Sequence, residues 1–323
     1  MSLFSTSNPQ FIVFMVTFVG IAVLSFIVLC VIAYRQAHRL TYSSQKNRHK
    51  HYDSHPELTP TTVGQHYQLN AHPLSLVTAD GLNLSAHYTP SCNGAAIILS
   101  HGYKMNSSEM IPIAALFAQH GYGILLQDQR AHGMSAGEQI SFGRDEWYDL
   151  EAAVNFLEKQ LGITSIGLFG NSMGGALSLC YAARDSRIKA VIAQSPYASI
   201  GHSIKKGVKQ FTGLPPFPFA PLVHFMAQRK LKINSSKLAP LNAIAKIHPR
   251  PVLLMMGGQD HYVEPQGIFA LHDAAGDSTE LWYEHDLDHV EFHEKHPVEF
   301  ERQVMTFYAH HLLNRPLKTT NNP

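Results

Sequence analysis

The chain has 323 residues, of which 45% are hydrophobic and 15% charged, and its formal net charge is +1 at pH 7. This length and composition fit one globular domain with additional segments. The near-neutral charge argues against a surface that binds nucleic acid. Three scattered cysteines are too few for a disulfide framework or a zinc site built on cysteine.

The N-terminal region contains a long apolar segment. Residues 11–34 read FIVFMVTFVGIAVLSFIVLCVIAY and carry no charge. A helix rises about 1.5 Å per residue, so this segment is long enough to cross a hydrocarbon core of about 30 Å. A buried core helix is rarely so long and apolar on every side, and a cleaved signal peptide is a poor fit because no basic residue precedes the run. We expect a short tail over residues 1–10 and a transmembrane helix over residues 11–34.

The charges around this helix predict its orientation. Before it there is no Lys or Arg, and after it come five basic residues: Arg35, Arg39, Lys46, Arg48 and Lys50. By the positive-inside rule the N-terminus lies outside and the rest of the chain is cytoplasmic. The polar residues 35–65 predict a solvated linker, whose basic residues can also touch anionic lipid headgroups. We therefore expect a chain that starts near residue 60 to keep the fold and its activity.

From residue 66 onward, short apolar runs alternate with stretches of helical spacing. Strands that are buried on both faces of a parallel sheet are apolar throughout. Five runs have this character: residues 95–100, 123–128, 165–170, 189–195 and 251–257. The alternation predicts an α/β domain over residues 66–314, with a mostly parallel sheet and helices on both faces. A C-terminal tail is expected over residues 315–323.

One interval interrupts this alternation. Residues 199–248 contain no strand-like run, but they contain GLPPFPFAP and further aromatic and aliphatic residues. This content argues against a long disordered loop. We expect a mostly helical lid that lies over one end of the sheet and forms much of an apolar substrate pocket.

Residues 166–175, IGLFGNSMGG, predict a strand that turns sharply into a helix. Ser172 lies between Gly170 and Gly174 in the pattern G-x-S-x-G. Such a turn leaves no room for side chains at the two flanking positions, and it exposes the serine hydroxyl at the carboxyl end of the sheet. The pattern is typical of a nucleophile elbow and makes Ser172 the candidate nucleophile.

A serine hydroxyl needs a base, and the base needs an acid that orients it. Asp260 ends the strand-like PVLLMMGGQD and is the candidate acid. Both His285 and His289 follow the last expected strand, STELWYEH. His289 is the better candidate base, because it lies in a loop whereas His285 still belongs to the strand end.

An oxyanion hole needs two backbone N–H groups that point at the developing negative charge. One is expected from Met173, the residue after the nucleophile. The other is expected from Tyr103, which follows Gly102 in the loop after strand 95–100.

These motifs resemble those of the α/β-hydrolase superfamily over residues 70–313. The segments that match are GNSMGG, HGY, DQRAHGMS, GGQDHYVEP and DHVEFHEKHPVEFERQVMTFY. In that family the base precedes the last helix, which implies His289 rather than His285. The resemblance suggests membrane-anchored hydrolases of the serine-peptidase-like or acyl-ester type. One departure is Ala131, where the family commonly has the first glycine of R-G-H-G.

The resemblance implies a serine hydrolase that cleaves an ester, thioester or amide through an acyl-enzyme intermediate, without a cofactor. Its substrate is expected to be a small or lipid-derived acyl compound. His289 and His293 are four residues apart, but no H-E-x-x-H motif is present and we expect no metal site. Asp128, Arg130 and His132 are expected to brace the elbow.

A second hypothesis belongs to another class of function. A membrane-tethered module could keep this fold as a binding surface without catalysis, because fold does not imply function. The intact set of Ser172, Asp260 and His289 favours the enzyme.

Overall fold

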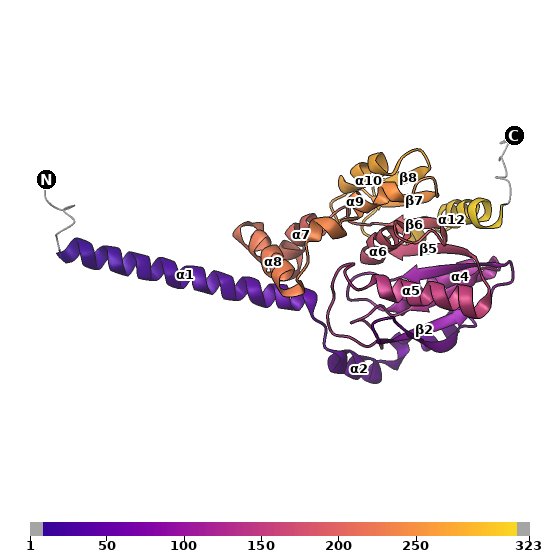
Figure 1. Cartoon of the computed structure of the whole chain (residues 1–323), viewed down its shortest axis with the longest axis horizontal. Coiled ribbons are helices and arrows are strands. Elements are labelled where there is room, and N and C mark those ends of the chain that lie inside the picture. Colours follow the sequence, from indigo (N-terminus) through magenta and orange to yellow (C-terminus); the bar gives the residue numbers. More distant parts are fainter. Residues whose placement is uncertain (1–8, 315–323) are drawn as a thin grey trace.

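One eight-stranded sheet organises the domain, and a single long helix, α1 (Pro9–Thr41), projects from it (Figure 1). The computed structural model of the chain describes residues 9–314. The expected C-terminal tail and most of the expected N-terminal tail lie outside these residues. The structure has the α/β-hydrolase architecture, in which helices cover a mostly parallel sheet.

The strands of the sheet lie in the order β1-β2-β4-β3-β5-β6-β7-β8. They have the following bounds: β1 (His72–Val77), β2 (Asn83–Thr89), β3 (Ala95–Ser100), β4 (Gly123–Gln127), β5 (Ser165–Asn171), β6 (Ile188–Gln194), β7 (Val252–Gly257) and β8 (Thr279–Glu284). β2 pairs antiparallel with β1 and β4, whereas all other pairs are parallel. All five predicted apolar runs form strands of the parallel part.

The hairpin of β1 and β2 is not among the five strands that apolar runs predicted. These strands lie at the edge of the sheet, and most residues of β1 are exposed. An edge strand needs no continuous apolar run, because solvent reaches one side of it. Leu76 and Leu84 face one another across the hairpin and are buried.

Helices cover both faces of the sheet. Successive residues of a strand point to opposite faces, and in β3 Ile98 belongs to one apolar cluster while Ile97 and Leu99 belong to another. The first cluster lies under α5 (Trp147–Asn155), α6 (Met173–Ala182) and α10 (Gly267–Ala275). The second lies under α4 (Ile111–Gln119), α11 (Phe292–Lys295) and α12 (Pro297–Leu313).

The predicted helical lid lies between β6 and β7. It consists of α7 (Ile200–Thr212), α8 (Pro216–Leu231), α9 (Pro240–Ala243) and short 3₁₀ turns. α8 packs beside the domain end of α1, as Figure 1 shows. Ala33 and Ala37 of α1 are fully buried and share an apolar cluster with Val223 and Ala227 of α8. Alanine at these positions lets the two helices approach closely.

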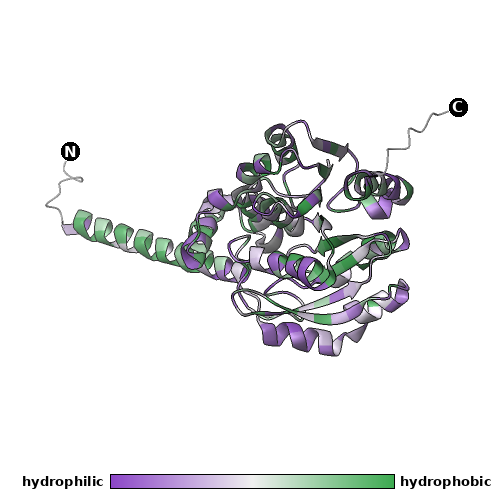
Figure 2. Cartoon of the chain, turned by 45° about the vertical axis from the view of Figure 1, so that its right-hand side comes forward, coloured by the Kyte–Doolittle hydropathy of each residue, from purple (hydrophilic) through white to green (hydrophobic). Residues whose placement is uncertain are grey.

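Among the described residues, α1 is the one helix long and apolar enough to cross a membrane, although a signal sequence can have the same character. It contains the whole segment predicted to span, residues 11–34. Figure 2 shows that α1 is hydrophobic over most of its length and becomes hydrophilic where it reaches the domain. Its large side chains are exposed, for example Phe14 and Phe26. A surface of this kind is stable in an apolar medium or against a partner.

The solvated linker predicted over residues 35–65 is not what the structure contains. α1 continues to Thr41, and α2 (Gln45–Ser54), a 3₁₀ turn (Pro56–Leu58) and α3 (Pro60–His66) follow it. The guanidinium of Arg48 donates hydrogen bonds to the backbone carbonyls of Gly133, Ser135 and Gly137. Polar side chains that composition assigned to water therefore bind the domain instead. The reason for expecting a chain without residues 1–59 to be unaffected is wrong.

A buried ion pair supports the loop after β4. The guanidinium of Arg130 lies 2.8 Å from carboxylate oxygens of both Asp149 and Asp80, and the backbone N–H of Arg130 donates to Asp149 at 2.8 Å. The Asp149 side chain is fully buried. Asp128, two residues earlier, accepts hydrogen bonds from Ser107 and from the N–H of Met134. These contacts confirm a hydrogen-bonded loop, and whether it braces the turn at Ser172 stays a prediction.

We expect Asp149→Ala to lower the free energy of unfolding by about 3–5 kcal/mol, because it leaves the buried Arg130 with a single, more exposed partner. Chemical denaturation of the detergent-solubilised chain measures this loss. Glu158→Ala is the matched control: its pair with Arg187 is partly exposed and should contribute about 1 kcal/mol or less. Equal losses in the two variants would contradict the bracing role of the buried pair.

Candidate active site

Ser172 occupies the turn between β5 and α6 in a strained backbone conformation, with φ 52° and ψ −114°. Non-glycine residues rarely adopt a positive φ, and such strain tends to occur at functional sites. Two hydrogen bonds hold the turn: the N–H of Ser172 donates to Gln194 O at 2.8 Å, and its carbonyl accepts from Ala176 at 3.1 Å. The side chain is left half-buried at the carboxyl end of the sheet.

The two glycines around Ser172 are required by contact distances. A Cβ atom on Gly170 would lie 2.4 Å from the carbonyl group of Gly174, and one on Gly174 would lie 2.1 Å from the carbonyl oxygen of Ser100. Both distances are far below van der Waals contact. The serine turn therefore lies directly against the end of β3, where the expected oxyanion loop begins.

His289 and Asp260 are joined by a hydrogen bond of 2.6 Å between Nδ1 and Oδ2. The other carboxylate oxygen of Asp260 accepts the N–H groups of Tyr262 at 2.8 Å and Val263 at 2.7 Å. An ionised carboxylate only accepts hydrogen bonds, so Nδ1 of His289 carries the proton and Nε2 is left as a proton acceptor. The Asp260 side chain is fully buried, whereas that of His289 is 15% exposed. The competing candidate, His285, is exposed and lies in the turn after β8.

The end of β6 brings the serine turn and the histidine loop together. Gln194 O accepts the N–H of Ser172, and the hydroxyl of the next residue, Ser195, accepts the N–H of Val290 at 3.4 Å. Ser172 and Val290, the residue after His289, are thus attached to consecutive residues at the carboxyl end of the sheet. Asp260 reaches the same edge from the end of the neighbouring strand β7.

Two further residues hold the acid and base loops. Oδ1 of Asp288 accepts the N–H groups of His261 at 3.0 Å and His289 at 2.7 Å. Burial alone would raise the pKa of Asp288, but these backbone hydrogen bonds lower it. Lys206 of the lid donates to the carbonyls of Asp260 at 2.7 Å and Val263 at 2.8 Å. The sequence offers a hint only for Asp288, which directly precedes the candidate base.

Glu109 connects the expected oxyanion loop to the serine turn. One of its carboxylate oxygens accepts the N–H of Gly102 at 2.7 Å, and the other accepts the side-chain amide of Asn171 at 3.2 Å. Gly102 immediately precedes the expected donor Tyr103, and Asn171 immediately precedes the candidate nucleophile Ser172. The sequence does not identify Glu109, because nothing local indicates which amides its carboxylate meets.

Tyr103 ties the same loop to the domain end of α1. Its hydroxyl donates to Leu40 O at 2.8 Å, and its ring stacks on Phe142 with centroids 5.8 Å apart. Burial raises the pKa of Tyr103, so the hydroxyl stays protonated and remains a donor. Lys104, the next residue, donates to Arg39 O at 2.9 Å. The backbone that carries one expected oxyanion donor is therefore held by the last turn of α1.

Two other histidines near the site are neutral. Nε2 of His101 accepts the N–H of Gln129 at 3.0 Å, so this nitrogen carries no proton. Burial holds the pKa of His132 well below its usual range. Neither ring has the partly exposed position and carboxylate partner of His289.

Comparisons with known proteins agree with this architecture. The family model described as serine aminopeptidase, S33, matches residues 91–240. The esterase Pf2001 of Pyrococcus furiosus superposes with a TM-score of 0.65 at 25% identity, over 77% of this chain and 94% of the esterase. YqkD of Bacillus subtilis is 27% identical over 70% of this chain and 74% of its own length. Thiohydrolase aneE of Aspergillus aculeatus is 35% identical over 38% of this chain and 41% of its own.

The fold, the serine turn and these similarities identify the chain as a member of the α/β-hydrolase superfamily, and as a hydrolase. These similarities favour an enzyme over the alternative of a module without catalysis. The matched family segment contains Ser172 but ends before Asp260 and His289.

We expect Gly174→Ala to displace Ser172, because the added methyl group forces the serine turn away from the carbonyl oxygen of Ser100. Turnover of a small ester should fall by at least about tenfold, as expected when reacting groups are displaced by 1 Å. Gly64→Ala is the matched control, since its Cβ would meet only Leu69 O at 3.6 Å. Unchanged turnover in Gly174→Ala would contradict the packing described here.

Proposed function

We propose that the chain is a membrane-anchored serine hydrolase that cleaves an ester, thioester or amide through an acyl-enzyme intermediate. Ser172 is the nucleophile, His289 the general base and Asp260 the acid that orients it. The observation that carries this proposal is the 2.6 Å hydrogen bond between His289 and Asp260, at the sheet edge where the strained Ser172 lies.

The proposed reaction uses these three side chains in turn. Nε2 of His289 accepts the proton of Ser172 as the hydroxyl oxygen attacks the substrate carbonyl. Asp260 stays ionised and stabilises the resulting imidazolium. His289 then protonates the leaving group, and water attacks the acyl-enzyme with the same histidine as base.

The N–H groups of Met173 and Tyr103 are the proposed donors to the oxyanion. Met173 begins α6, and the first N–H groups of a helix have no acceptor within it. Glu109 and the contact with α1 position the loop that carries Tyr103. Each such donor contributes about 3–4 kcal/mol of transition-state stabilisation.

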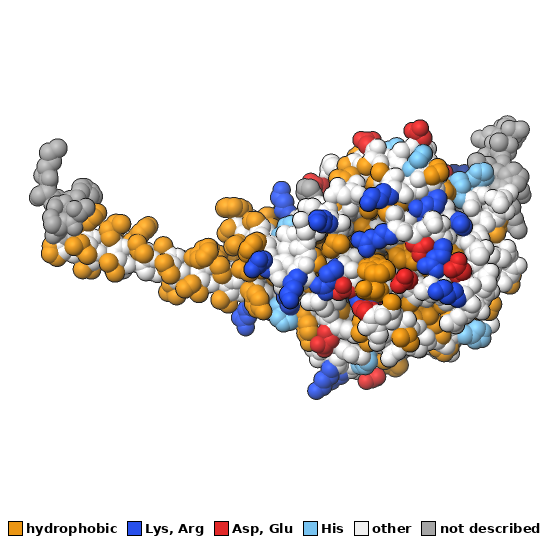
Figure 3. All heavy atoms as spheres, viewed as in Figure 1, with side chains coloured by type: hydrophobic (Ala, Val, Ile, Leu, Met, Phe, Trp, Pro, Cys, Tyr) orange, Lys and Arg blue, Asp and Glu red, His pale blue; other side chains and the backbone are white. Residues whose placement is uncertain are grey.

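Acyl substrates of membrane origin fit the surroundings best. Phe217 and Phe225 of α8 are 80% and 55% exposed. Figure 3 shows hydrophobic side chains continuing from α1 onto the adjoining lid. An esterase and a thiohydrolase among the similar proteins support an ester or thioester, while the matched family model supports an amide. We favour a lipid-derived ester or thioester, because the lid lies against the proposed membrane helix.

The proposed orientation places the domain in the cytoplasm. The basic residues after the apolar segment support it through the positive-inside rule. The same helix continues into residues that contact the lid and the proposed oxyanion loop. These contacts support an anchor that stays on the domain over a signal peptide that is cleaved off. Protection from protease added outside sealed cells measures this orientation.

A fluorophosphonate probe should label the wild-type chain, and Ser172→Ala should abolish the label. His289→Ala should lower turnover of a p-nitrophenyl ester by several orders of magnitude, because the hydroxyl loses its proton acceptor. His285→Ala is the matched control and should cost little. Label that persists on Ser172→Ala would refute the nucleophile, and a larger loss in His285→Ala would refute the base.

Tyr103→Phe should lower kcat several-fold and leave KM nearly unchanged, because losing the bond to Leu40 loosens a donor that acts in the transition state. Tyr42→Phe is the control: its hydroxyl also ties the end of α1 to the domain, through Glu138, but it carries no proposed catalytic amide. Equal kcat losses would indicate that attachment of α1 alone, and not the position of Tyr103, matters.

A further inference from the structure

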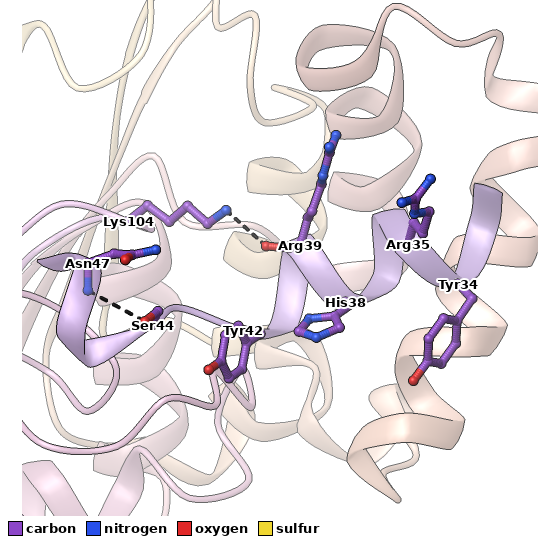
Figure 4. A pocket seen from close by; sticks show the side chains of 8 residues that line it. All are labelled: Tyr34, Arg35, His38, Arg39, Tyr42, Ser44, Asn47 and Lys104. Atoms are coloured by element: carbon purple, nitrogen blue, oxygen red, sulfur yellow. Dashed lines mark hydrogen bonds between the residues drawn. The ribbon is translucent and has the colours of Figure 1, made fainter. Parts of the chain in front are cut away.

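A pocket of about 520 Å³ opens where α1 meets the domain (Figure 4). Its walls come from the last turns of α1, from the start of α2 and from the loop after β3. Arg35, His38 and Arg39 line it from the helix, and Lys104 lines it from the domain. It lies outside the proposed catalytic groups, although Lys104 directly follows Tyr103.

The lining of this pocket is rich in cationic donors. Arg35 and Arg39 are one helical turn apart and extend from the same side of α1, as Figure 4 shows. Lys104 uses one hydrogen bond on Arg39 O and has two ammonium protons left. Removal from water, and then the charge of Arg39, lowers the pKa of Lys104. Lys230 of α8 adds a cation 5.7 Å from the ring of Tyr42.

Negative charge is scarce at this position. Among the described residues, no carboxylate lines the pocket or pairs with Arg35, Arg39 or Lys104. The nearest one that the lining contacts is Glu138, which accepts the hydroxyl of Tyr42 and the N–H of Gln45. Several cations thus face one open space without acidic partners, an arrangement that favours a bound anion.

The pocket also lies at a defined depth relative to the proposed membrane. It starts at Tyr34, the last residue of the apolar segment, and continues over the next two turns of the helix. Aromatic residues at this point of a span occupy the headgroup layer, and basic residues beyond it meet the phosphates of the cytoplasmic leaflet.

We propose that this pocket binds a phosphate group, and that its occupant is the headgroup phosphate of an anionic membrane lipid. Arg35, Arg39 and Lys104 supply the charge, and guanidinium groups match the geometry of phosphate oxygens. A free phosphate ester has the same chemistry, but the position beside the span favours the lipid. The inference rests on the proposed membrane span and does not depend on the proposed catalytic residues.

Native mass spectrometry of the full chain in detergent tests this site. Phosphatidylglycerol is titrated against phosphatidylcholine, and glycerol phosphate is added in a separate arm. Wild type should retain phosphatidylglycerol at least about tenfold more tightly than phosphatidylcholine. That preference should disappear when three charges of the pocket are neutralised together: Arg35→Gln, Arg39→Gln and Lys104→Gln.

The matched control removes the same charge from exposed positions away from the pocket: Lys159→Gln, Lys189→Gln and Lys246→Gln. It should keep the lipid preference, and an equal loss would overturn a defined site in favour of a general field effect. Binding of glycerol phosphate with the affinity of the lipid would overturn the lipid as occupant. Equal binding of both lipids by wild type would overturn anion selection.

Two measurements separate this inference from its premises. Alkaline carbonate washing of membranes tests the span, and release of the full chain would remove the basis for a lipid at this depth. Ser172→Ala should bind phosphatidylglycerol like wild type, so failure of the proposed chemistry leaves the lipid result unaffected. Both triple variants should melt near the temperature of wild type. A much lower melting temperature in the pocket variant alone would mean that these residues stabilise the fold and would overturn their role in binding.

Discussion

The rest of the site depends on how closely the turn at Ser172 approaches the end of β3. Side chains at Gly170 and Gly174 would overlap with backbone atoms. The turn can therefore hold Ser172 in this position only because both residues are glycine. Gly174 packs against the backbone carbonyl of Ser100, and the loop that contains Gly102 and Tyr103 starts at the next residue. Gln194 at the end of β6 holds the turn from the opposite side. One tight backbone contact thus brings the proposed nucleophile and the proposed oxyanion loop to the same end of the sheet.

The N-terminal helix α1, the proposed anchor, also packs on the domain and bonds to it. Carbonyl groups at the end of a helix have no partner within it, and here Tyr103 and Lys104 supply donors to two of them. The same turns of α1 pack on the lid helix α8. α1, the lid and the proposed oxyanion loop therefore form one continuous set of contacts, which fixes the proposed site relative to α1.

The buried carboxylates Glu146 and Asp149 have close structural partners. Glu146 accepts three hydrogen bonds of 2.6 Å from Ser141 and Gly143, and Asp149 is paired with Arg130. Both carboxylates are held by structural partners, and burial raises the pKa of Asp149 to about 7 although Arg130 opposes the rise. His289 differs, because one of its nitrogens is held by Asp260 while the ring remains partly exposed. That combination of a fixed tautomer and access is what a general base requires.

The sequence by itself determined the sheet, the lid and the candidate nucleophile. Strands buried on both faces must be apolar throughout, and a turn without room for side chains must carry glycine, so both features are legible locally. The sequence also favoured His289 over His285, and the structure confirms that His289 meets Asp260. The tertiary structure alone decided that Glu109 and Asp288 hold the loops and that Arg48 binds the domain. A carboxylate or an arginine looks the same in a sequence whether its partner is water or a carbonyl ninety residues away. Only folding brings those partners together.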